Sequence, residues 1–372
     1  MRKMVNIQAS LKIAAAFIVI IVVVVMGAIY FEQNVSHGIP FVKTDKPSFA
    51  NVSPPSSSLK LIQTISLPNV NGIIDHMAID TKNQKLFIAE LENNSLDVID
   101  LKASRRIHSV SNNGLGEPQS VIFIPDLNRI FVSNGRDGTV DIFDAKSFSF
   151  IKKIKLPSVD ADNMRYDPNN KLVYVGYGEG SLGIINATNY NIVGDIKLTG
   201  HPESFQIEEQ KRIIGQQQRI FVNVPLYNSI AVVNSEKHTV STMWPIVNAQ
   251  NNFPMALDEA NHRLFVGTRD PPKLMVFDTE SGKVISLLDI AKDPDDIFYD
   301  AAKKRIYVSC GEGFINVFQQ QEDANHYNAI GSIRTAQGAR TSLLVAELDR
   351  FYLAVPHLGN QESKILVYEV GQ

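Results

Sequence analysis

The sequence predicts an all-β fold assembled from seven copies of one four-stranded unit. The main observation is a valine-rich strand motif that recurs at intervals of roughly 42–47 residues. Larger segments repeat with it: "DNMRYDPNNKLVYVGYGEG" (162–180) returns as "DDIFYDAAKKRIYVSCGEG" (295–313). Four strands in about 40–45 residues are typical of one β-propeller blade, so we expect a seven-bladed β-propeller. The motif copies are "LFIAE" from Leu86, "IFVSN" from Ile130, "VYVGY" from Val173, "IFVNV" from Ile220, "LFVGT" from Leu264, "IYVSC" from Ile306 and "FYLAV" from Phe351.

Each copy reads as four strands, A to D, joined by turns. In the first copy these are "MAID" (77–80), "LFIAE" (86–90), "LDVIDL" (96–101) and "RIHSV" (106–110). Strand B is an almost continuous apolar run, which is expected of a strand buried on both faces. The connecting turns, such as "TKNQK" and "DPNNK", carry the Asn, Asp and Pro residues that tight turns favour.

The last copy lacks its fourth strand, because the chain ends after "KILVYEV" (364–370). A strand of the right kind stands at the other end: "LKLIQTISLP" (59–68) matches the D-strand pattern "SFIKKIKLP" (149–157). Pairing of the N- and C-terminal strands in one blade would close the ring and leave no open edge there. We therefore expect the propeller to span residues 59–372.

A transmembrane helix is expected to precede the propeller. Residues 13–31 are uncharged and mostly aliphatic, and about 20 such residues cross a bilayer as a helix. Basic residues lie before this span, so residues 1–12 should be cytoplasmic and the propeller extracytoplasmic. A cleaved signal peptide is the alternative, but its apolar region usually runs about 7–15 residues and ends in small residues. The Ser/Pro-rich residues 32–58 read as a linker, which predicts a single-pass protein of the cell membrane.

Charge and cysteine content exclude several classes of site. The net charge is −3, and no basic stripe is visible, so we expect no nucleic-acid partner. Cys310 is the single cysteine, which rules out an internal disulfide and a Cys-based zinc site.

Several segments resemble the YVTN-repeat, or YncE-like, β-propellers of the WD40/YVTN repeat-like superfamily. They are "RIFVSNGRDGTVDIFD", "LVYVGYGEGSLGIIN", "RLFVGTRDPPKLMVFDTESGKV" and "RIYVSCGEGFINVF". The resemblance covers about residues 59–370 and implies a seven-bladed ring with a binding or surface role. The single Trp244 does not match the tryptophan-docking repeats of quinoprotein dehydrogenases.

The repeat also predicts which residues meet at the channel. Strand A lines the centre of a propeller, and the D–A and B–C loops share one face, where ligands usually bind. Residues just before strand A should therefore form a ring at one mouth, with His357 in the last B–C loop nearby. The first ring position holds Asp75, Gln119, Asp162, Glu203, Phe253, Asp295 and Arg340, and the second holds His76, Ser120, Asn163, Ser204, Pro254, Asp296 and Thr341.

These residue types suggest a cation site. Ca²⁺ and similar hard ions favour converging carboxylate and amide oxygens, which Asp75, Asn163, Glu203 and Asp295 would supply. Lactonase-like propellers resemble this arrangement and use such an ion to hydrolyse esters. Alternatively, the ring is a solvated channel rim without a ligand. His76, His201 and His357 also map to this face, where they would ligate a transition metal or act as a base.

The leading functional expectation is a membrane-anchored binding platform for a protein, a glycan or a small ligand. A metal-dependent hydrolase or lactonase and a structural cell-surface component are the alternatives. Propellers host binders and enzymes alike, so the fold does not decide between them. A platform requires exposed apolar side chains on one face, for which Phe253, Tyr227 and Tyr177 are candidates.

Overall fold

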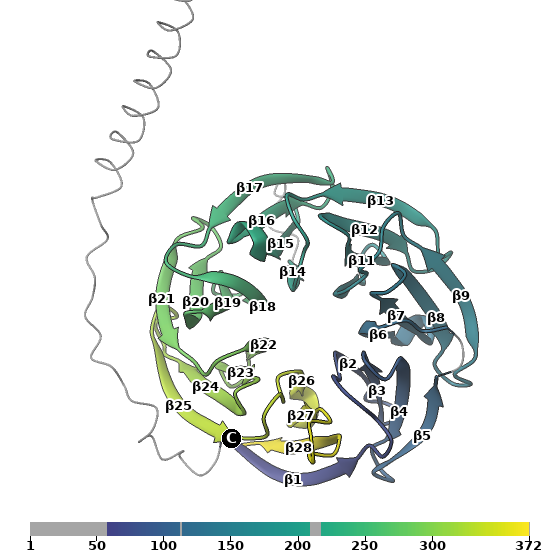
Figure 1. The fold of residues 1–372 in the computed structure, drawn as a ribbon. Coiled ribbons are helices and arrows are strands. Elements are labelled where there is room, and N and C mark those ends of the chain that lie inside the picture. The colour runs from purple at the N-terminus through teal and green to yellow at the C-terminus, as the bar shows by residue number, and fades with distance from the viewer. Residues whose placement is uncertain (1–57, 112–113, 209–216, 372) are drawn as a thin grey trace, which may run out of the picture. The chain divides into compact units, whose positions relative to one another are not determined.

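A computed structural model describes residues 58–111, 114–208 and 217–371. They form seven four-stranded antiparallel sheets around an open centre, which confirms the seven-bladed β-propeller (Figure 1). The segments expected to be cytoplasmic (1–12) and transmembrane (13–31), and the linker up to residue 57, lie outside the described residues. Within the described ranges, no helix is long and apolar enough to cross a membrane.

Each of the first six blades runs from an inner strand A to an outer strand D in chain order, so that the seven A strands surround the centre (Figure 1). Blade 1 comprises β2 (Met77–Asp80), β3 (Lys85–Glu90), β4 (Ser95–Asp100) and β5 (Arg105–Val110). Blade 2 comprises β6 (Pro118–Ile124), β7 (Arg129–Asn134), β8 (Thr139–Asp144) and β9 (Phe150–Lys155). Blade 3 comprises β10 (Met164–Asp167), β11 (Leu172–Tyr177), β12 (Ser181–Asn186) and β13 (Ile192–Lys197). Blade 4 comprises β14 (Phe205–Ile207), β15 (Arg219–Val224), β16 (Ser229–Asn234) and β17 (Thr239–Pro245).

The remaining blades follow the same plan, with one exception in the last. Blade 5 comprises β18 (Gln250–Asp258), β19 (Arg263–Asp270), β20 (Pro272–Asp278) and β21 (Val284–Asp289). Blade 6 comprises β22 (Pro294–Asp300), β23 (Arg305–Cys310), β24 (Phe314–Gln320) and β25 (Tyr327–Arg334). Blade 7 takes β26 (Ser342–Val345), β27 (Arg350–Val355) and β28 (Lys364–Val370) from the C-terminal end and β1 (Leu59–Ser66) from the other. In the described part of the chain, three single-turn 3₁₀ helices lie in loops: η2 (Pro125–Leu127), η3 (Pro225–Tyr227) and η4 (Ala346–Leu348).

The turn between strands A and B is stabilised by an aspartate that recurs at the end of strand A. In blade 1 the Asp80 carboxylate accepts a hydrogen bond from the backbone N–H of Asn83 at 2.9 Å. Asp167 binds the N–H of Asn170 in the same way at 3.2 Å. Aspartate favours such turns because its side chain bonds the backbone two or three residues ahead. This is the physical reason why an aspartate ends strand A in several blades.

The core lies between neighbouring blades. Strands B are buried almost throughout, and their side chains meet those of the next blade. Trp244 of β17, for example, lies with its ring centroid 5.4 Å from that of Phe221 and 6.4 Å from that of Phe277, and so joins blade 4 to blade 5.

Closure of the ring occurs within blade 7, as the sequence predicts. β1 and β28 pair antiparallel from Leu59↔Val370 to Ser66↔Lys364. The side chain of Ile65 in β1 is buried in a cluster that includes Leu86 of blade 1. The N-terminal strand therefore completes its own sheet and also packs against the first blade.

The strand directions define two faces. β1 begins at Leu59 and ends at Ser66, beside the D–A and B–C loops. We call this loop face the mouth face. Ser58, where the described chain begins, therefore lies at the opposite face.

We expect a chain that begins at Leu67 to unfold at a much lower temperature than one that begins at Ser58. Without β1, the edge of β28 is open and the cluster loses Ile65. Thermal unfolding followed by circular dichroism measures the difference.

Two substitutions in β1 test the contribution of side-chain packing while the strand itself is kept. Ile65→Ala should destabilise the protein by about 2–5 kcal/mol, because it leaves a cavity in the core. Leu61→Ala, at an exposed position of the same strand, should have little effect. Equal losses for the two variants would contradict this account of the closing blade.

Candidate functional site

The channel holds a cavity of about 510 Å³ lined by the inner strands. Its wall is apolar over much of its length, with Met164, Met255, Phe298 and Leu343 among the lining residues. Polar and charged side chains also contribute to the lining. These are His76, Ser120, Arg165, Ser204, Asp296, Ser342, Gln206, Tyr166 and Tyr299.

Asp75, His76 and Asp296 form a first charged group. The Nδ1 atom of His76 lies 2.6 Å from Oδ1 of Asp75, and its Nε2 atom lies 4.0 Å from Oδ1 of Asp296. The backbone N–H of Ser342 donates to Oδ2 of Asp296 at 2.6 Å. All three charged residues belong to the predicted ring.

The pKa values of all three side chains in this group are raised. Burial disfavours charged His76, but the attraction of Asp75 outweighs it and raises the pKa of His76 to about 10. Burial raises the pKa of Asp75, despite the opposing effect of His76. Burial also raises the pKa of Asp296, to about 7.

Asp295 lies in a second group, between two guanidinium groups. Arg269 binds its Oδ1 atom, and Nε of Arg340 lies 3.0 Å from its Oδ2 atom. Both arginines also contact Asp293, at 3.2 Å for Arg269 and 2.9 Å for Arg340. The Arg269 guanidinium stacks over the ring of Phe253, 3.8 Å from its centroid. Both oxygens of Asp295 are therefore already paired with cations.

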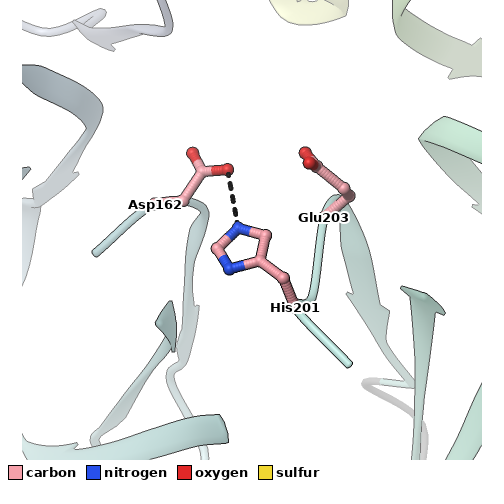
Figure 2. A group of neighbouring side chains, drawn as sticks. All are labelled: Asp162, His201 and Glu203. Carbon is pink, nitrogen blue, oxygen red and sulfur yellow. Dashed lines mark ion pairs between the residues drawn. The ribbon is translucent and has the colours of Figure 1, made fainter. Parts of the chain in front are cut away.

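Asp162, His201 and Glu203 form a third group (Figure 2). One ligand atom from each lies within 4.8 Å of the others. Nε2 of His201 is 3.9 Å from Oδ2 of Asp162, and its Nδ1 is 2.6 Å from the carbonyl oxygen of Gly178. Burial raises the pKa of Glu203 to about 8. Burial opposes the charge on His201, yet the hydrogen bond to Asp162 and other contacts raise its pKa to about 9.

The expected metal ligands are thus divided among different surroundings. Asp75 pairs with His76, Asp295 pairs with two arginines, and Glu203 alone belongs to the third group. Asn163 is buried, and its Oδ1 atom has no hydrogen-bond partner among the described residues. Gln119 donates to Oδ1 of Asp160 at 3.0 Å.

Of the three histidines expected at this face, His76 and His201 lie among the mouth carboxylates. His357 is exposed, and its backbone N–H donates to the carbonyl oxygen of Gly72 at 3.3 Å. Its side chain has no ion pair with the mouth carboxylates in the described part of the chain. The expectation that Tyr177 is exposed is wrong: it is buried, and its hydroxyl donates to Oδ2 of Asp195 at 2.6 Å.

Arg165 was not singled out in the sequence, because it lies two positions beyond the predicted rings on strand A. Its guanidinium donates to the carbonyl oxygen of Met164 at 2.8 Å and to Oγ of Ser204 at 3.4 Å. It forms no ion pair with a carboxylate of the described residues, and burial lowers its pKa. Arg269 and Asp293 were also missed, since Arg269 lies near the end of strand B and Asp293 lies in a D–A loop before the aligned ring positions.

The raised pKa values predict that stability falls as the mouth deprotonates. The folded protein binds a proton on Asp296 more tightly than the unfolded chain does. The protonated Asp296 side chain therefore contributes fully to the free energy of unfolding below pH 3.8, and this contribution is lost as the pH rises toward 7. The contribution of protonated His76 to the free energy of unfolding is lost between pH 6.5 and about pH 10. We expect Asp296→Asn to make the decline in the free energy of unfolding between pH 4 and 7 shallower.

Denaturant titrations at a series of pH values measure that slope. Asp126→Asn is the matched control, because Asp126 is exposed in the turn after β6. It should leave the slope as it is in the parent protein. A slope in Asp296→Asn equal to that of the parent would show that Asp296 titrates normally.

Comparisons with known proteins identify the fold. No protein-family model matches the sequence, and no curated protein matches it significantly. Among solved structures, the chain is similar to one titled Kuenenia stuttgartiensis hydrazine synthase, with a TM-score of 0.68, 15% identity, and coverage of 82% of this chain and 96% of that one. It is also similar to a chain of a mitotic checkpoint complex, with a TM-score of 0.70, 11% identity, and coverage of 91% and 100%. At these identities, the likeness establishes a β-propeller and nothing finer.

Proposed function

We propose that this protein is a membrane-anchored propeller of the YVTN-repeat type that binds a partner at its mouth face. Residues 13–31 would be the anchor, residues 32–58 the linker, and the propeller would lie outside the cytoplasm. The observation that carries the proposal is the distribution of exposed apolar side chains. In the described chain, large exposed apolar residues occur either on outer strands or on loops of the mouth face.

The mouth-face residues surround the charged channel. Leu226 and Tyr227 in the B–C loop of blade 4 are 74% and 57% exposed. Val247 in the neighbouring D–A loop is also exposed, and the two loops are joined by a 2.8 Å hydrogen bond from Ile246 N–H to the carbonyl oxygen of Asn228. We call Leu226, Tyr227 and Val247 the apolar patch. An apolar patch beside buried polar anchors is the composition of a protein-binding surface.

The direction of the chain supports this use of the mouth face. The described chain begins at Ser58, on the face opposite the mouth, so a tether attached there would leave the mouth free. One similar solved chain was determined within a multiprotein assembly, the mitotic checkpoint complex. That neighbour supports a protein as the partner.

The anchor is tested by removing residues 1–31. We expect the full chain to stay with membranes after a high-salt wash and the shortened chain to be released, because residues 13–31 are the apolar span. An N-terminal tag that remains on the membrane-bound protein would distinguish an anchor from a cleaved signal peptide. Release of the full chain by salt would contradict the proposal.

The patch is tested by substituting one of its residues. Leu226→Ser should abolish co-purification of proteins that the parent retains, because it removes apolar contact area at the interface. Leu287→Ser is the control, since Leu287 is 56% exposed but lies on outer strand β21. Quantitative mass spectrometry of cross-linked, tagged protein compares the partners that the parent, Leu226→Ser and Leu287→Ser retain. Retention of the same partners by Leu226→Ser and the parent would contradict this docking site.

Metal-dependent hydrolysis at the mouth is the second candidate. It is favoured by the Asp162–His201–Glu203 group and by the cavity of about 510 Å³ in the channel. Assays with simple esters and lactones, with and without added divalent ions, test it.

A further inference from the structure

We propose that Asp162, His201 and Glu203 bind one divalent transition-metal ion, of the class of Zn²⁺ or Mn²⁺. The site shares no residue with the apolar patch, and hydrolysis at the mouth would require it. Three side chains from two neighbouring blades point toward one another, with His201 between the two carboxylates (Figure 2).

The first argument is that the two carboxylates lack other strong partners. Asp75, Asp295 and Asp296 are held by a histidine, by arginines or by a backbone N–H. Glu203 accepts no hydrogen bond and forms no ion pair among the described residues. Asp162 is only 6% exposed, and among the described residues the cationic side chain within ion-pair distance of its carboxylate is His201, at 3.9 Å. Buried carboxylates are normally paired or coordinate a metal.

The second argument is the orientation of the imidazole. Nδ1 of His201 is 2.6 Å from the carbonyl oxygen of Gly178, so Nδ1 carries the proton and donates it there. Nε2 faces Asp162, and it would coordinate the ion after releasing the proton that it shares with that carboxylate in the metal-free site. Histidine ligands of metals almost always donate their other N–H to a carbonyl or a carboxylate in this way. Gly178 is held in turn by its own N–H, which donates to the carbonyl oxygen of Val159 at 2.9 Å.

The third argument is the spacing of the three donor atoms. Ligand atoms around a tetrahedral Zn²⁺ lie about 3.3 Å apart, as follows from metal–ligand bonds of about 2.0 Å. The three donor atoms lie within 4.8 Å of one another, so a small movement of one side chain would bring them to the spacing that the ion requires. Glu203 can supply it, because its long side chain is not fixed by a hydrogen bond among the described residues.

The donor set selects the class of ion. One imidazole and two carboxylates suit Zn²⁺, Mn²⁺ or Fe²⁺, whereas Ca²⁺ requires six to eight oxygens. This differs from the all-oxygen site expected from Asp75, Asn163, Glu203 and Asp295. Three protein ligands also leave at least one coordination position for water or a small ligand.

Metal binding is measured by calorimetry on the full chain in detergent, after chelator treatment, with Zn²⁺, Mn²⁺ and Ca²⁺ as separate probes. We expect one Zn²⁺ or Mn²⁺ per chain and much weaker binding of Ca²⁺. Asp162→Asn and Glu203→Gln should each weaken binding by more than about 100-fold, because even residues that only orient a ligand contribute about 10–100-fold. Substitution of Co²⁺ should give visible absorption bands that His201→Asn removes.

Asp296→Asn is the matched control, because it removes the same charge from the same mouth outside the three ligands. It should bind metal like the parent. Thermal unfolding without metal verifies that each variant is folded. The proposal fails if the parent binds none of these ions, if Asp162→Asn and Glu203→Gln bind like the parent, or if Asp296→Asn loses as much affinity as they do.

Discussion

The structure depends on the antiparallel pairing of β1 with β28. The apolar core of a propeller lies between neighbouring blades, so the ring has no central core that would hold it closed. The β1–β28 ladder joins the two ends of the ring, and Ile65 adds apolar contacts to blade 1. The seven inner strands then begin at one mouth. Residues as distant in sequence as Asp75 and Asp296 can interact with the same histidine only because the ring is closed.

The carboxylates at the mouth differ in how fully neighbouring cationic side chains compensate their charge. The groups around His76 and Asp295 are neutralised internally, by a histidine on one side and two arginines on the other. Such pairs offset the cost of burying charge and mainly fix geometry. Among the described residues, His201 is the cationic side chain within ion-pair distance of Asp162, and Glu203 forms no ion pair. A bound cation would complete the compensation there, while Arg165 adds a positive group to the lining of the cavity.

The sequence predicted the fold well and the site only in part. The repeat fixed the number of blades, the strand order and the closing pair, because strand periodicity is a local property. It also placed Asp75, His76, Asp162, Glu203 and Asp296 at one mouth. It could not show which of them pair, since that depends on side-chain direction and on Arg269 and Asp293, which lie outside the aligned positions. Tyr177 illustrates the same limit: alignment placed it in a B strand but did not reveal that it points into the core.

The position of β1 has a mechanical consequence. The chain enters the propeller at Ser58, on the face opposite the mouth, and β1 then runs the full height of blade 7. If a partner holds the mouth while the N-terminal side is pulled, the force acts along β1. All of its hydrogen bonds to β28 then share the load in shear, and none is peeled open before the others. Resistance to forced unfolding is a matter of unfolding rate, so the strand that closes the ring would also set how long the domain survives under tension.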